Sequence, residues 1–113
     1  MSSPEDLAET QRLVEEAGGE MSTLVADVRS SADTQRGVDH AMERYGRIDI
    51  VVANAGIDSI DPTLHMTDQA WDDVIGVNLT GVFRTIQPAL KHMIEGGRGG
   101  SIVATSSCAG LTP

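Results

Sequence analysis

Three polar segments each close an apolar run in the sequence, and their side chains could bind or react with a ligand. Asp27 and Arg29 end the first run, Asn54 follows the second, and Ser106 and Ser107 follow the third. A carboxylate accepts hydrogen bonds, an amide donates and accepts them, and a hydroxyl can stabilise charge on a neighbouring oxygen. Each residue type is also common where a strand gives way to a turn, so no segment identifies a site by itself.

The apolar runs predict β-strands over residues 24–28, 48–53 and 101–105. The middle run is almost unbroken, which is typical of a strand covered on both faces of a parallel sheet. Helix-length segments separate the runs, as crossovers between parallel strands require. The predicted fold class is therefore α/β, with a doubly wound parallel sheet. Ligands of such sheets bind beyond the carboxyl ends of the strands, which places the three polar segments at one crevice.

Capping residues and glycines set the predicted helix boundaries. Ser3 can cap a first helix, the pair Ser30-Ser31 a second, and Thr67 a helix that begins at Asp68, while Gly46 should end the helix before the second strand. Pro88 should bend the last helix. The helices are expected over residues 4–17, 31–45, from 68 onward, and over 79–94, where apolar residues recur every three or four positions.

Composition excludes several classes of function. The 113 residues suffice for one domain, and a formal net charge of −9 leaves no basic surface for nucleic acid. Cys108 is the single cysteine, so we expect a buried filler and neither a disulfide nor a zinc cluster. The three histidines lack ligand spacing, so no metal is expected. No run is long enough for a membrane helix and no secretory signal is visible, so a cytoplasmic location is expected.

Taken together and in order, the motifs resemble those of the short-chain dehydrogenase/reductase family over nearly the whole chain. The matching stretches are Ala26-Asp27-Val28, IDIVVANAG at 48–56, WDDVIGVNLTG at 71–81 and GSIVATSSCAG at 100–110. The opening PEDL and the HMIEGGRGGS run at 92–101 resemble the mycofactocin-coupled branch, which includes carveol-dehydrogenase-like enzymes. The resemblance implies hydride transfer between a nicotinamide cofactor and a small secondary alcohol or ketone. The implied cofactor is NAD, with NADP as the alternative.

Six residues would contact the cofactor by this resemblance: Asp27, Val28, Asn54, Ala55, Gly56 and Val77. Asp27 would accept a hydrogen bond from the adenine amino group, with Val28 beside the ring. The segment from Asn54 to Gly56 would lie under the adenosine ribose, where a glycine lets the ligand approach the backbone. Asn54 would also tie neighbouring strands together.

Two residues would take part in catalysis by the same resemblance. Ser107 aligns with the hydroxyl that hydrogen-bonds the substrate oxygen, and Ser106 is the alternative one position earlier. Asn78 matches the active-site asparagine that bends a helix and orders a water in the proton relay. Asn78 also begins an N-glycosylation pattern, but we expect it on a helix that packs inside the protein.

The sequence departs from the family pattern in three places, one of which is the absent acidic end of the second strand, which would choose NAD over NADP. It contains no glycine-rich turn after a first strand and no Tyr-x-x-x-Lys pair, and its one tyrosine, Tyr45, belongs to a predicted helix. Residues 1–113 are therefore expected to be the central segment of the dinucleotide-binding domain, without its first two strands and its C-terminal part. A gap should separate strand 24–28 from the other two strands and leave bare apolar faces. We expect these 113 residues alone to be unstable and inactive.

The complete enzyme would be a homotetramer, since helix 79–94 resembles the subunit-interface helix of the family. Two other functions are compatible with the sequence. One is a member of the same fold that binds or senses a nucleotide without catalysis. The other is a receiver-like signalling domain, although that class would require clustered acidic residues after its first strand.

Overall fold

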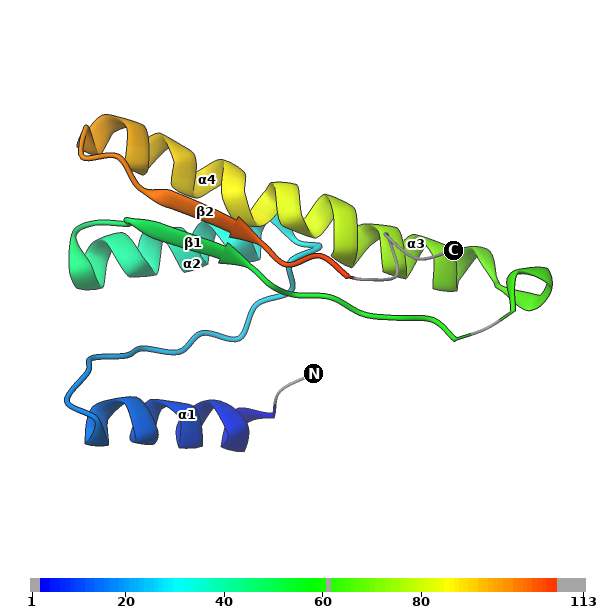
Figure 1. Cartoon of the computed structure of the whole chain (residues 1–113), viewed down its shortest axis with the longest axis horizontal. Coiled ribbons are helices and arrows are strands. Elements are labelled where there is room, and N and C mark those ends of the chain that lie inside the picture. Colours follow the sequence, from blue (N-terminus) through cyan, green and yellow to red (C-terminus); the bar gives the residue numbers. More distant parts are fainter. Residues whose placement is uncertain (1–2, 61, 108–113) are drawn as a thin grey trace.

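The computed structural model describes residues 3–60 and 62–107 (Figure 1). Cys108, expected to be a buried filler, lies outside the described residues. The elements, in chain order, are α1 Pro4–Glu16, α2 Ser31–Tyr45, β1 Ile50–Ala53, a 3-10 turn Thr63–His65, α3 Asp68–Ile75, a π-helical turn Gly76–Thr80, α4 Gly81–Gly96 and β2 Ser101–Ala104.

The two strands form a parallel sheet, as the sequence predicts. Ile50 pairs with Ser101 at one end and Ala53 with Ala104 at the other. The pairing continues past the last pair, because the Thr105 N–H donates to the Ala53 carbonyl over 3.0 Å. Both strands therefore end at the same edge, where Asn54 and Thr105 follow them.

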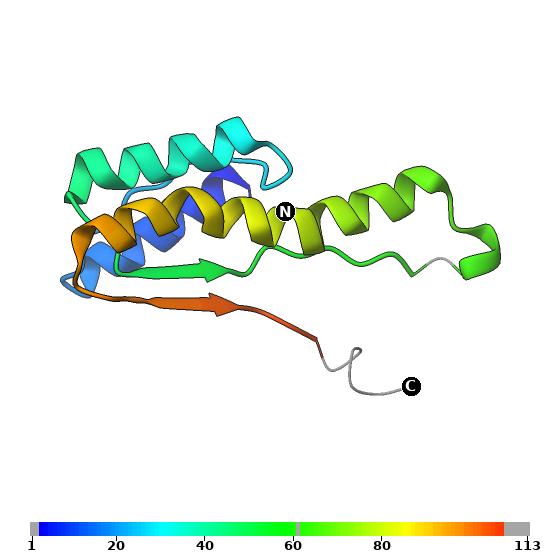
Figure 2. The same cartoon turned by 90° about the horizontal axis from the view of Figure 1, so that it is seen from above.

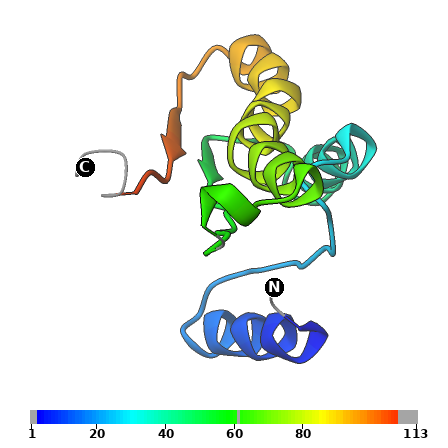
Figure 3. The same cartoon turned by 90° about the vertical axis from the view of Figure 1, so that its right-hand side faces the viewer.

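Helices α2 and α4 pack on the same side of this sheet (Figures 2 and 3). The core between them consists of Val38, Val51, Ala89 and Met93. On the other side of β1, Ile50 is 66% exposed and Val52 is 55% exposed. The expectation that both faces of this strand are covered is therefore wrong for the described residues, whereas the predicted bare apolar face is confirmed.

Residues 24–28 do not form the predicted strand. They run extended toward α2, but no other described segment pairs with them, and Val25 is 72% exposed. A strand requires a hydrogen-bonded neighbour, which an apolar run cannot supply by itself. An open groove of about 650 Å³ lies between Ala26 and Val28 on one side and β1 on the other. This groove corresponds to the predicted gap.

The capping predictions are confirmed. The Ser3 hydroxyl accepts from the Asp6 N–H and the Asp6 carboxylate accepts in return, while Ser30 caps α2 and Thr67 caps α3. Gly46 ends α2 in the left-handed conformation, with φ of 72°. The helix boundaries therefore follow from local sequence.

Helix α1 stands apart from the other elements (Figures 1 and 3) and buries none of its residues. The Cα radius of gyration is 16.2 Å, against roughly 13 Å for a compact domain of this length. The main buried cluster is formed by α2, α4 and one face of β1. Over residues 3–60 and 62–107, no helix combines the length and apolar character needed to cross a bilayer.

Candidate functional site

Asn78 lies in the π-helical turn that joins α3 to α4 without a break. Its side-chain amide makes two hydrogen bonds to Ile57, one donated by Nδ2 to the carbonyl over 2.8 Å and one accepted by Oδ1 from the N–H over 2.9 Å. The expectation that Asn78 packs inside the protein is wrong, since the residue is exposed. These two bonds fix the π turn to the loop that follows β1.

The ends of the two strands are also tied to each other through side chains. Thr105 Oγ1 donates a hydrogen bond to Asn54 Oδ1 over 2.8 Å. The predicted tie between neighbouring strands is thereby confirmed, and Thr105 is its partner. Ser106 and Ser107 follow directly and are exposed, so this hydrogen bond anchors the backbone just before the candidate serines.

Val28 packs tightly against the start of α4. A Cβ added to Gly81 would stand 2.7 Å from Val28 Cγ2, closer than real Cβ atoms come. Only a glycine leaves room for Val28 at this point. The segment that carries Asp27 is therefore seated against the same helical region that carries Asn78.

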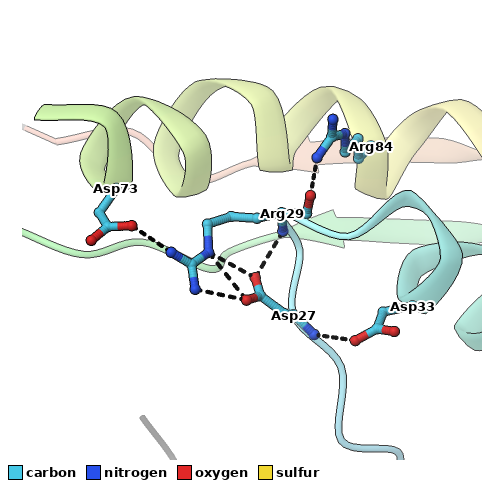
Figure 4. A network of polar contacts seen from close by, with 5 residues as sticks. All are labelled: Asp27, Arg29, Asp33, Asp73 and Arg84. Carbon is cyan, nitrogen blue, oxygen red and sulfur yellow. Dashed lines mark hydrogen bonds and ion pairs between the residues drawn. The ribbon is translucent and has the colours of Figure 1, made fainter. Parts of the chain in front are cut away.

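Asp27 is held by its neighbour Arg29 (Figure 4). The Arg29 Nη2 donates to Asp27 Oδ2 over 2.8 Å, Nε lies 3.1 Å from both carboxylate oxygens, and the Arg29 N–H donates to Oδ1 over 2.9 Å. Hydrogen bonds from the guanidinium, the largest cause, and then from the backbone N–H lower the pKa of Asp27. The carboxylate is therefore ionised at neutral pH and acts as a hydrogen-bond acceptor.

The same guanidinium reaches a second carboxylate on α3. Arg29 Nη1 donates to Asp73 Oδ1 over 2.5 Å, and the Arg29 carbonyl accepts a hydrogen bond from Arg84 of α4 (Figure 4). The Asp27 N–H, in turn, donates to Asp33 of α2 over 3.0 Å. The turn at residues 27–29 is thus tied to three helices.

These contacts link the three polar strand ends that sequence analysis singled out. Segment 27–29 contacts α3 and α4, the π turn contacts the loop after β1 through Ile57, and Asn54 contacts Thr105 after β2. Asp27 and Asn54 are connected through these elements, and Ser107 lies two residues after Thr105.

The other three predicted cofactor residues lie in the same region. Gly56 and Ala55 follow β1 and are exposed, and a Cβ on Gly56 would meet Asn78 Oδ1 at an ordinary 3.7 Å. The backbone at Gly56 is therefore open to approach from outside. Val77 is largely buried inside the π turn, with 9% exposure, so little of its surface can meet a ligand.

Arg29, Asp73 and Gly81 contact or support the segment that carries Asp27, and the sequence did not predict these contacts. An arginine two residues after an aspartate is a local signal for an ion pair, but the partner on α3 is 44 residues away in the sequence. The large groove beside β1 contains Val28 but neither Asn78 nor Ser107, so it is not the candidate site. No cluster of metal-ligating side chains occurs among residues 3–60 and 62–107.

Comparison with known proteins gives consistent matches. The profile described as short chain dehydrogenase matches residues 1–113. A (-)-trans-carveol dehydrogenase of Rhodococcus erythropolis is 43% identical over 112 residues, which are 98% of this chain and 40% of that protein. An uncharacterised NAD-dependent oxidoreductase of Mycobacterium tuberculosis is 48% identical over 95% of this chain and 39% of its own length.

Solved structures show the same likeness. The crystal structure of carveol dehydrogenase from Mycobacterium avium in complex with NAD superposes with a TM-score of 0.93 and 43% identity, covering all of this chain and 41% of that one. The crystal structure of a short-chain type dehydrogenase/reductase from Mycobacterium marinum superposes with a TM-score of 0.92 and 31% identity. The match covers 97% of this chain and 43% of that one. The chain thus spans about 40% of the length of the proteins it matches.

Proposed function

Because this chain belongs to the short-chain dehydrogenase/reductase family, we propose that it forms the central part of an NAD-dependent oxidoreductase. The enzyme transfers hydride between a small secondary alcohol or its ketone and the nicotinamide ring. The observation that carries the proposal is the pair of hydrogen bonds between Asn78 and Ile57. It holds the π turn at the carboxyl end of β1, the edge where α/β sheets bind nucleotides.

The residues after β1 and before α2 suit the adenosine half of NAD. Asp27 offers an ionised, exposed acceptor for the adenine amino group, with Val28 beside the ring. Gly56 leaves its backbone open to the ribose, alongside Asn54 and Ala55. Val77 contributes through the small part of its surface that remains exposed. NAD, when bound, supplies the acceptor for the hydride.

Ser107 and Asn78 serve the reacting end of the site. The Ser107 hydroxyl hydrogen-bonds the substrate oxygen and stabilises the charge that develops on it during hydride transfer. Asn78, which Ile57 holds in place, orders a water in the proton relay. A tyrosine and a lysine, which the family places after the serine, complete the proton transfer from another part of the enzyme.

The test uses the protein expressed from its complete reading frame, titrated with NAD and NADP by calorimetry and assayed for alcohol oxidation by NADH absorbance. Ser107→Ala should lower kcat by about 100-fold, the loss typical of one hydrogen-bond donor to a developing oxyanion. It should leave the Kd for NAD within about twofold, since Ser107 faces the substrate.

Ser106→Ala is the matched control and should keep kcat within about threefold. A protein that binds NAD but oxidises no alcohol would support a nucleotide sensor of this fold instead. A protein that binds neither dinucleotide would overturn the proposal.

We further propose that the complete protein is a cytoplasmic homotetramer of the mycofactocin-coupled branch. Support for the assembly comes from α4 and its preceding turn, where three large apolar side chains at helical spacing are more than half exposed: Leu79, Phe83 and Ile94. Such a face requires a partner. Sedimentation should give four copies, and Phe83→Glu should dissociate them, whereas Gln35→Glu, at an exposed position of α2, should not.

A further inference from the structure

The guanidinium of Arg29 bridges two carboxylates that belong to different parts of the proposed site. One is Asp27, the proposed adenine acceptor, and the other is Asp73, on the helix that leads into the Asn78 turn. The sequence comparison with the family motifs gives Arg29 no role. Its contacts, however, determine where the Asp27 carboxylate points.

We propose that Arg29 is a positioning residue for NAD binding, which aims the Asp27 carboxylate at the adenine amino group by clamping it against α3. The proposal rests on the proposed function, because it assumes that Asp27 meets the adenine. Arg29 does not contact the cofactor in this role and acts through Asp27.

The geometry supports a clamp rather than a simple neighbouring charge. The fork of Nε and Nη2 meets the two Asp27 oxygens, while Nη1 is directed to Asp73. A planar guanidinium can satisfy both carboxylates at once, whereas the compact ammonium of a lysine cannot match this fork. The Arg84 bond to the Arg29 carbonyl fixes the backbone from which the side chain extends.

The clamp leaves Asp27 able to bind a further donor. A carboxylate has about four acceptor positions, and three N–H groups of Arg29, those of the backbone, Nε and Nη2, bind it, which leaves about one position. The Asp27 side chain is 45% exposed. An incoming amino group can therefore reach a carboxylate whose orientation is already set, which reduces the ordering cost of binding.

The test compares the Kd values of NAD and of nicotinamide hypoxanthine dinucleotide, which carries an oxygen in place of the adenine amino group. It uses the protein expressed from its complete reading frame. Wild type should favour NAD, and Asp27→Asn should abolish the preference because an amide can also donate to the oxygen. Arg29→Gln should reduce the preference by about two- to fivefold, the scale of an exposed ion pair, and Arg29→Lys should restore it only in part.

Arg47→Gln is the matched control. Arg47 makes the same kind of exposed two-pronged pair with Asp49, two residues away, but at the opposite end of β1. This variant should keep the wild-type preference. Asp73→Asn is an independent test in case Arg29→Gln does not fold. It should also reduce the preference for NAD over nicotinamide hypoxanthine dinucleotide.

The outcomes distinguish a failure of the proposed function from a failure of the positioning role of Arg29. If Asp27→Asn leaves the preference intact, or no dinucleotide binds, the proposed function fails and the inference fails with it. If Asp27→Asn abolishes the preference while the Arg29 and Asp73 variants weaken both dinucleotides equally, Arg29 is only structural and the inference is overturned alone.

Discussion

Gly81 and Val28 approach so closely that a Cβ on the glycine would stand 2.7 Å from Val28 Cγ2. This contact seats the proposed adenine-binding segment on the first turn of α4, close to the turn that carries Asn78. The size of the side chain at position 81 of α4 is thus limited by Val28, before α2, although 53 positions separate the two residues in the sequence.

Gly81→Ala should destabilise the protein by about 1–3 kcal/mol, because Val28 is β-branched and cannot rotate away cheaply. This cost exceeds the gain of up to about 1 kcal/mol that alanine brings to a helix. Urea denaturation of the protein expressed from its complete reading frame measures the change. Val28→Ala should restore most of the loss in the double variant, and Gly37→Ala on α2, whose Cβ would meet nothing within 4 Å, should not destabilise. An equal loss at Gly37 would contradict the steric explanation.

Asn78→Asp should be more harmful than Asn78→Ala at neutral pH. The alanine variant loses two hydrogen bonds to Ile57, at about 1 kcal/mol each. An ionised aspartate would in addition place a carboxylate oxygen against the Ile57 carbonyl. Protonation restores a donor at that point, so the aspartate variant should regain stability as the pH falls from 7 to 5, whereas the alanine variant should not. Equal pH dependence in the two variants would argue against this pairing.

Thr105→Val should loosen the joined ends of the two strands, because it removes the hydroxyl that bonds Asn54 and keeps the shape. The expected loss of stability is about 0.5–1.5 kcal/mol. Thr105→Ser retains the hydroxyl and serves as the control. Hydrogen exchange at the amide of Thr105, which donates to Ala53, should be faster in the valine variant only. Unchanged exchange would show that the backbone pairing alone holds the strand ends.

Local signals in the sequence predicted the helices well. The hydroxyls of Ser3, Ser30 and Thr67 cap the helices that follow them, and Gly46 ends α2, because caps depend on residues within a few positions of each other. The parallel pairing of β1 with β2 followed from the helix-length crossover between them. These features need no information from distant parts of the chain.

Features that depend on distant partners were predicted less well. Residues 24–28 have a strand-like composition, but pairing requires a neighbour that the sequence pattern does not reveal. The π turn at Asn78 was expected only as a bend, through the family resemblance. The bridge from Arg29 to Asp73 depends on a contact across 44 positions, which no short-range motif encodes. The position of the candidate site therefore stays a prediction, whereas the contacts that hold its residues in place required the structure.

The 113 residues purified alone should not unfold cooperatively and should oxidise no alcohol in the presence of NAD. Their core is confined to a few side chains, α1 buries nothing, and large apolar residues such as Ile60 and Leu64 are about nine-tenths exposed. So little burial is not expected to offset the conformational entropy of the chain. A sharp calorimetric transition together with NADH formation would contradict this expectation.

Acid should remove the stabilisation that the Asp27–Arg29 pair provides. Guanidinium hydrogen bonds lower the pKa of Asp27 in the folded protein, while the unfolded chain keeps the ordinary value near about 3.9. Between these two values the unfolded state binds more protons, so stability decreases as the pH falls. The pair's contribution is complete above the ordinary pKa and is lost as the pH drops through the lowered, folded-state value.

The measurement is the difference in unfolding free energy between wild type and Arg29→Gln, both expressed from the complete reading frame, determined in urea from pH 7 down to pH 3. That difference should stay constant from pH 7 to about pH 5 and then shrink, because the variant leaves Asp27 without the guanidinium that lowers its pKa. The Arg47→Gln variant should behave in the same way, since Arg47 is the largest cause of the lowered pKa of Asp49. High salt should reduce both differences, as both pairs are exposed. A difference that grows toward low pH would show that Arg29 stabilises the fold without acting on the ionised Asp27.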